Sequence, residues 1–152
     1  MTFKTKSKTE FVDEHEVTIN DFDSGVNIML GLGCEKKYYY EKLREIWHLG
    51  NAEIVFDTNP GRYDIMEVEA KTKKDLIETI KLLDLENVAH DDFKDMELYE
   101  KPFGIIIPNL VDMTFTTIKN TLGPLVTKNE KKFTKLVNEQ IKMFKLIKKS
   151  SI

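Results

Sequence analysis

Hydrophobic and polar positions alternate along much of the first half of the chain, a period typical of β-strands. Residues 2–20 are predicted to be extended, with lysines and then glutamates repeating on one face. The pattern changes to helical spacing over 21–32, where Asp23 or Ser24 can cap the free amides and two glycines end the helix. The start of the chain therefore predicts strands followed by a helix.

Three further segments, 36–50, 52–58 and 62–71, predict an antiparallel meander, because short turn sequences separate them. Alternation leaves each strand one apolar face, made of Leu43, Trp47, Ile54, Phe56, Met66, Val68 and Ala70. The predicted helices 21–32 and 73–84 each carry an apolar stripe. We expect these helices to cover that face and to form the core with it.

The rest of the chain is predicted to be mainly helical. A helix over 73–84 has Thr72 and Asp75 placed as a variant capping box. Two more helices are predicted over 110–123 and 126–149. The last has an apolar stripe formed by Phe133, Leu136, Val137, Ile141, Phe144 and Ile147.

Composition narrows the class of protein. The chain has 152 residues, 41% hydrophobic and 32% charged, as in an ordinary globular domain. Its net charge of −3 is unevenly distributed, since eight lysines and two glutamates lie from Lys128 onward. A single cysteine, Cys34, excludes an internal disulfide framework and fits a reducing compartment. With no apolar run of the ~20 residues needed to span a bilayer, we expect a cytoplasmic protein without a membrane partner.

The opposite face of the predicted meander carries charge: Lys42, Arg44, Asp57, Glu67 and Glu69. One interpretation is a solvated surface with cross-strand ion pairs, each worth ~0–1 kcal/mol. The other is a concave site in which the carboxylates bind Mg²⁺ or Mn²⁺ and the cations bind phosphate. The pattern alone leaves both open.

Four pieces of sequence resemble a known family: "EHEVTINDFDSGVNIMLGLG", "EKLREIW" (a K-x-R strand), "AEIVFDTNPG" and "RYDIMEVEAKTKKDLIETIKLLDL" with its E-x-E strand. In this order and spacing they resemble the CYTH superfamily of triphosphate tunnel enzymes. That superfamily includes class IV adenylate cyclases, thiamine triphosphatases, inorganic tripolyphosphatases and fungal-type RNA triphosphatases. The resemblance covers about residues 4–100.

The resemblance implies a tunnel of strands whose inner wall binds a triphosphate. It implies phosphate binding by Lys42, Arg44, Lys6 and Lys8, and places Lys4 and Glu16 toward the lumen. It implies Asp57, Glu67 and Glu69 as ligands of Mg²⁺ or Mn²⁺, and Glu67, Glu69 and Lys42 as catalytic residues. The leading expectation is metal-dependent binding of a triphosphate; a catalytic site would hydrolyse it, in preference to adenylate cyclisation.

The matching pieces resemble the second half of a tunnel domain. We therefore expect an α+β fold: a curved antiparallel sheet of about five strands, flanking helices and a helical C-terminal extension. The expected domains are 1–100, CYTH-like, and 101–152, the extension. Three ways of covering the open edge of such a half-barrel stay open: the C-terminal helices, a second copy, or another chain that completes the barrel. The expected ligand is a triphosphate compound or an RNA 5′ end. The alternatives are an interaction module on a CYTH scaffold and a nucleic-acid adaptor that uses the basic C-terminal helix.

Overall fold

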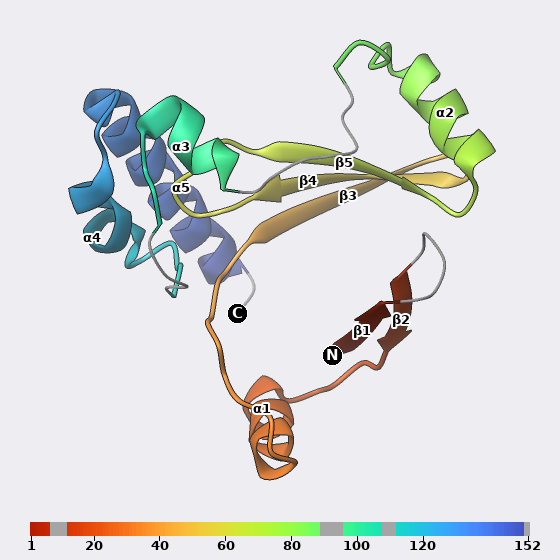
Figure 1. Cartoon of the computed structure of the whole chain (residues 1–152), viewed down its shortest axis with the longest axis horizontal. Helices are drawn as coiled ribbons and strands as arrows, with labels where there is room; N and C mark the ends of the chain where they lie inside the picture. The colour runs from red at the N-terminus through yellow and green to blue at the C-terminus, as the bar shows by residue number, and fades with distance from the viewer. Residues whose placement is uncertain (7–11, 89–95, 108–111, 151–152) are drawn as a thin grey trace. The chain divides into compact units, whose positions relative to one another are not determined.

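The computed structural model (Figure 1) describes residues 1–6, 12–88, 96–107 and 112–150. These residues form an α+β fold in two compact units, Met1–Lys37 and Tyr38–Ile152. The α+β class predicted from the sequence is confirmed. The described strands belong to two antiparallel sheets, one of two strands and one of three. The predicted division at residue 100 stays a prediction.

The first unit is a hairpin followed by a helix. Strands β1 (Thr2–Lys6) and β2 (Val12–Glu16) pair antiparallel, and α1 follows at Phe22–Gly31. The cap of α1 is Asp21, whose Oδ1 accepts a 2.6 Å hydrogen bond from the Ser24 amide. Our prediction of Asp23 or Ser24 was therefore wrong by two or three positions, since the capping residue needs the extended backbone that Asp21 has.

The second unit contains the predicted meander. Strands β3 (Leu43–Leu49), β4 (Ala52–Thr58) and β5 (Ile65–Ala70) pair antiparallel in the order β3-β4-β5. Helix α2 (Lys73–Leu82) follows, and the predicted cap is confirmed, because Thr72 Oγ1 accepts a 3.1 Å hydrogen bond from the Asp75 amide. Figure 1 shows α2 at the end of the sheet where β5 finishes.

The strand predicted over 36–50 is wrong in its first part, because β3 begins only at Leu43. The backbone just before β3 pairs with a distant segment instead. The Met113 amide donates to the Tyr39 carbonyl at 2.8 Å, and the Glu41 amide donates to the Met113 carbonyl at 2.9 Å. Aromatic residues predicted extended backbone here. The sequence pattern could not identify this remote pairing partner.

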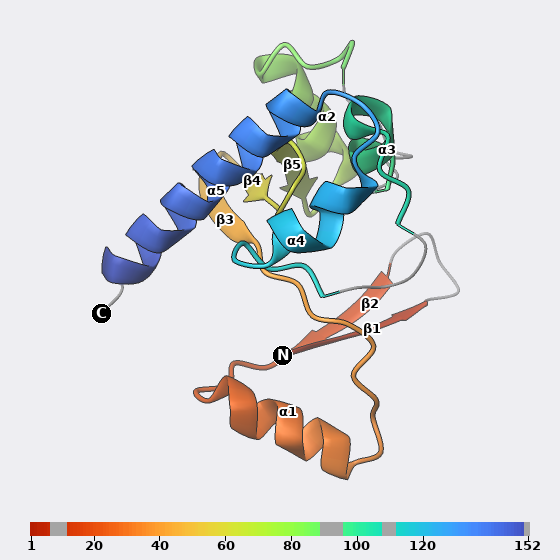
Figure 2. The same ribbon diagram turned by 90° about the vertical axis from the view of Figure 1, so that its left-hand side faces the viewer.

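The core of the second unit lies among its C-terminal helices. These are α3 (Glu97–Phe103), α4 (Ile118–Leu122), the short 3₁₀ helix η1 (Gly123–Leu125) and α5 (Glu130–Ser150). Their buried cluster consists of Tyr99, Phe103, Ile105, Ile118, Leu122, Phe133 and Val137. Figure 2 shows α5 running past α4, with its last turns extending beyond it. The helix predicted over 110–123 is thus shorter than expected, since α4 begins at Ile118.

The apolar face of the sheet is not the core that we predicted. Trp47 is 59% exposed, and Phe56 and Met66 are each 39% exposed. Ala52 and Ile54 on the same face are buried. Helix α2, which contacts β5 and β4, has only ten residues. It therefore covers one end of this face and leaves Trp47, Phe56 and Met66 exposed.

Candidate functional site

The register of the three strands determines which charged residues share a face. Arg44 lies opposite Asp57, Val55 lies opposite Glu67, and Glu53 lies opposite Glu69. Because side chains alternate along a strand, these residues all project from one side of the sheet. The predicted polar face of β3, β4 and β5 is confirmed in this respect.

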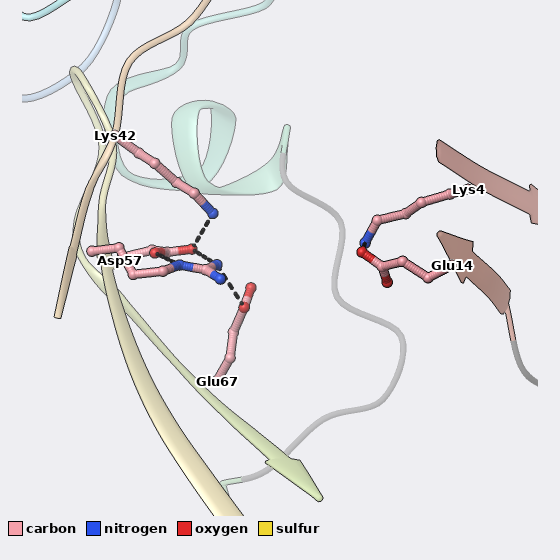
Figure 3. Close-up of polar contacts among 6 residues, drawn as sticks. Lys4, Glu14, Lys42, Asp57 and Glu67 are labelled. Atoms are coloured by element: carbon pink, nitrogen blue, oxygen red, sulfur yellow. Dashed lines mark hydrogen bonds and ion pairs between the residues drawn. The ribbon is translucent and has the colours of Figure 1, made fainter. Parts of the chain in front are cut away.

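Four of the predicted site residues form a connected cluster, hereafter the polar cluster: Lys42, Arg44, Asp57 and Glu67 (Figure 3). Lys42 Nζ donates to Asp57 Oδ2 at 2.8 Å. Arg44 binds the same carboxylate with two donors, Nε to Oδ1 at 2.7 Å and Nη2 to Oδ2 at 2.6 Å. Arg44 Nη2 also reaches Glu67 Oε2 at 3.4 Å. Asp57 is the centre of the cluster.

The cluster is buried at its centre and open at its edge. The side chain of Asp57 is 3% exposed, whereas those of Lys42, Arg44 and Glu67 are each about one-third or more exposed. Burial alone would raise the pKa of Asp57, but the hydrogen bonds from Arg44 and Lys42 outweigh it, and the pKa lies below its ordinary value. The bidentate contact with Asp57 raises the pKa of Arg44. Asp57 is therefore ionised at neutral pH.

Glu69, predicted as a third metal ligand, lies two residues further along β5 and outside these hydrogen bonds. Its neighbour across the sheet is Glu53, whose Oε1 lies 3.8 Å from His48 Nδ1. Our site prediction omitted Glu53, although alternation along β4 places it on the same face as Asp57. A hollow of about 410 Å³ is lined by these three residues, by the β3–β4 turn and by the end of β5.

The carboxylates do not form a preassembled metal cage. In the described part of the chain, no three His, Cys, Asp or Glu side chains are grouped as a metal site. The chemistry of the donors nevertheless fits a hard cation, because Asp57, Glu67 and Glu69 offer carboxylate oxygens from one face. Both carboxylate oxygens of Asp57 accept hydrogen bonds from Lys42 and Arg44. A metal ion that binds Asp57 would therefore displace at least one of these hydrogen bonds.

The turn after Asp57 is fixed by residues that we did not predict for the site. Gln140 of α5 accepts a 2.9 Å hydrogen bond from the Gly61 amide and donates to the carbonyls of Asn59 and Arg62 at 3.0 and 2.9 Å. Tyr99 Oη donates to the Pro60 carbonyl at 3.0 Å. A sequence signal for Gln140 existed, since it falls among the apolar positions of the last helix.

The N-terminal residues of the predicted site are less fully placed. Lys4 lies on β1 and pairs with Glu14 on β2, with Nζ 3.1 Å from Oε1. Glu16 accepts a 2.9 Å hydrogen bond from Thr2. The side chain of Lys6 and the whole of Lys8 lie outside the described residues. Their role in phosphate binding stays a prediction.

A sheet face with clustered basic and acidic residues offers the groups that phosphates and divalent cations take as ligands. Comparison with protein families gives this class a name. The family model of the CYTH domain matches residues 1–90, more than half of the chain, and the chain belongs to this family. Domains of the family bind triphosphate compounds together with divalent metal ions.

No curated protein and no solved structure matches the chain significantly. Among the described residues, none of the helices combines the length and the apolar character that crossing a bilayer requires. The family assignment thus rests on the domain match and on the residues described above.

Proposed function

We propose that the polar cluster and Glu69 bind the triphosphate group of a nucleotide, an RNA 5′ end or inorganic polyphosphate, together with Mg²⁺ or Mn²⁺. The observation that carries this proposal is the convergence of Lys42 and Arg44 on the buried carboxylate of Asp57. Two cations held at one point of a sheet, each still reaching solvent, form a receptor for phosphate oxygens.

Hydrogen-bonding capacity supports this assignment. Lys42 has three N–H donors and Arg44 has five, and the contacts with Asp57 and Glu67 use only some of them. Asp57 holds both cations in place before a ligand arrives, which reduces the entropy lost on binding. The remaining donors can then take phosphate oxygens.

Asp57, Glu67 and Glu69 are the residues that would hold the metal ion. A bound divalent ion would neutralise negative charge on the phosphate chain and on these carboxylates. Lys42 and Arg44 would orient the phosphates. Glu67, which is partly exposed, would position a water molecule for hydrolysis of the terminal phosphoanhydride. The catalytic activity that we propose for this site is thus the hydrolysis of a triphosphate.

Titration calorimetry with tripolyphosphate, with and without Mg²⁺ or Mn²⁺, tests the proposal. We expect metal-dependent binding by the wild-type chain. Changing Lys42→Gln together with Arg44→Gln should abolish it, whereas Lys74→Gln with Lys101→Gln on α2 and α3 should leave it unchanged. Absence of metal-dependent binding at millimolar tripolyphosphate would instead favour an interaction module on the CYTH scaffold.

The acidic residues need a separate test. Glu67→Ala combined with Glu69→Ala should remove the metal dependence of binding and any release of phosphate. Both side chains are partly or largely exposed, so the melting temperature should change by no more than about 2 °C. A variant that keeps metal-dependent binding would remove Glu67 and Glu69 from the proposed ligand set.

Assembly and location form the last part of the proposal. We propose that a second copy or another chain completes the barrel, which sedimentation velocity with and without tripolyphosphate would detect as a change in mass.

A cytoplasmic location agrees with the free, exposed thiol of Cys34. Fluorescence microscopy of the tagged protein in its own cells tests this location.

A further inference from the structure

Helix α5 has a charge opposite to that of the rest of the chain. It contains seven lysines and two glutamates, a formal net charge of +5, whereas the whole chain carries −3. The helix lies outside the residues that match the CYTH domain. Its basic character therefore needs an explanation that is separate from the triphosphate site.

The lysines of α5 are arranged in a line. Residues 131, 135, 138, 142, 145 and 149 follow one another at intervals of four and three, which places them on one side of a helix. Five of them are lysines, the sixth is Asn138, and all six are exposed. We call this set the lysine stripe, and it extends over about 27 Å at a rise of about 1.5 Å per residue. A shallow hollow of about 670 Å³ follows its first four positions.

The opposite side of α5 is occupied by the protein's own core. Phe133, Val137, Gln140 and Phe144 are buried there. A helix that binds a membrane surface needs its apolar side free to enter the lipid. In α5 that side is covered as far as Phe144, so the helix offers charge over most of its length and apolar surface only in its last turns.

The chemistry of the lysine stripe fits a phosphodiester backbone better than it fits a protein. Lysine is depleted in protein–protein interfaces, which rely on aromatic and apolar residues that the stripe lacks. A nucleic-acid strand presents single negative charges at regular intervals, and lysines bind them without reading sequence. Within the described residues, one ion pair occupies the stripe, Lys135 Nζ to Glu139 Oε1 at 3.9 Å.

We propose that the lysine stripe of α5 binds the sugar–phosphate backbone of nucleic acid. The site is independent of the polar cluster and does not need a triphosphate end. Binding should be insensitive to sequence, because the stripe presents no aromatic side chain for stacking and no side chain other than Asn138 for reading base edges.

Fluorescence anisotropy with a labelled oligouridylate of about ten nucleotides tests the proposal, since single-strand sites span about 4–16 nucleotides. The probe has a 5′-hydroxyl end, so failure of the triphosphate proposal cannot affect the result. We expect Lys135→Gln, Lys142→Gln and Lys149→Gln in one chain to weaken binding about tenfold. The slope of log K against log salt should fall by about 2, at about 0.7 for each lost phosphate contact.

A control variant removes the same charge elsewhere, through Lys81→Gln, Lys119→Gln and Lys132→Gln, which are exposed positions on α2, α4 and another side of α5. It should bind the oligonucleotide like the wild type, and circular dichroism should show both variants folded. Equal losses in both variants would overturn the proposal in favour of general charge attraction. Tighter binding of a polyglutamate peptide or of phosphatidylserine vesicles would overturn it in favour of a protein or a lipid surface.

Discussion

Two lysine–carboxylate pairs differ in their surroundings (Figure 3). On the β1–β2 hairpin, Lys4 Nζ lies 3.1 Å from Glu14 Oε1, and the two side chains are 63% and 41% exposed. In the three-stranded sheet, Lys42 Nζ lies 2.8 Å from Asp57 Oδ2, and the Asp57 side chain is 3% exposed. The distances are similar, so the difference between the pairs is burial and the number of partners.

That difference determines what each pair contributes. An exposed pair is screened by water and salt and is typically worth about 0–1 kcal/mol. A buried carboxylate loses its hydrogen bonds to water, and donors of the protein must replace them. Asp57 receives three hydrogen bonds from Lys42 and Arg44. A lysine and a carboxylate therefore form a weak surface contact at one place and part of a buried, multiply hydrogen-bonded cluster at the other.

The burial of Asp57 coincides with the tight packing of the turn that follows it. A Cβ atom built on Gly61, where φ is +76°, would lie 3.0 Å from Ile118 and 3.2 Å from Leu122. Gln140 binds three backbone groups of the same turn. The helical C-terminal segment thus holds the turn that follows Asp57 in the family domain.

The largest expected effect comes from removing this support. Gln140→Leu keeps the side-chain size but leaves the Gly61 amide and the Arg62 carbonyl without their partner, while the Asn59 carbonyl keeps only its 3.4 Å hydrogen bond from the Arg62 amide. Each buried unsatisfied group costs about 1–3 kcal/mol, so we expect a loss of about 3 kcal/mol or more in the free energy of unfolding. Urea denaturation measures it. The matched control, Asn138→Ala on the exposed side of α5, should change the free energy by about 0.5 kcal/mol or less.

A smaller but still large effect is expected at the centre of the polar cluster. Asp57→Asn preserves the shape but removes the charge that Lys42 and Arg44 share, leaving the two cations close together. Hydrogen bonds to charged groups contribute about 1.5–3 kcal/mol, and the partial exposure of both cations places the loss near 2 kcal/mol. Urea denaturation at pH 7 checks this value. A variant as stable as the wild type would show that the charge of Asp57 does not stabilise the fold.

The dependence of that loss on pH follows from the lowered pKa of Asp57. A carboxyl group with a folded-state pKa below its unfolded value of about 3.9 stabilises the protein above that value, and the contribution is lost as pH falls through the folded pKa. The difference in unfolding free energy between wild type and Asp57→Asn should be constant from about pH 5 to 8 and shrink below about pH 4. A difference unchanged down to pH 2 would contradict a lowered pKa.

The sequence predicted which charged residues share a face of the sheet better than it predicted the packing around them. Alternation in three short strands was sufficient to place Arg44, Asp57, Glu67 and Glu69 on one face, because a strand has a fixed period of two. The same alternation identified the apolar face but could not tell how much of it a ten-residue helix would cover. Trp47 and Met66 were therefore assigned to the core, and the structure leaves them exposed.

Sequence patterns could not predict contacts between segments that are far apart in the chain. The bonds of Tyr39 and Glu41 with Met113 join segments more than 70 residues apart, and no periodicity encodes them. A role for Gln140 could have been predicted, because a polar residue at a buried helical position requires hydrogen-bond partners. Which groups it binds, the backbone of the turn at 59–62, depends on the tertiary fold.

The smallest effect is expected at the exposed pair, and it is the most direct check on the comparison. Glu14→Gln removes one charge from a pair whose side chains both face water, so the free energy of unfolding should fall by about 0.5 kcal/mol or less. Raising the salt concentration to 1 M should abolish even this difference, since charges there are screened within about 3 Å. The loss caused by Asp57→Asn should largely survive the same salt, because Asp57 is buried. If the two variants lost equal stability, burial would not be what separates the two pairs.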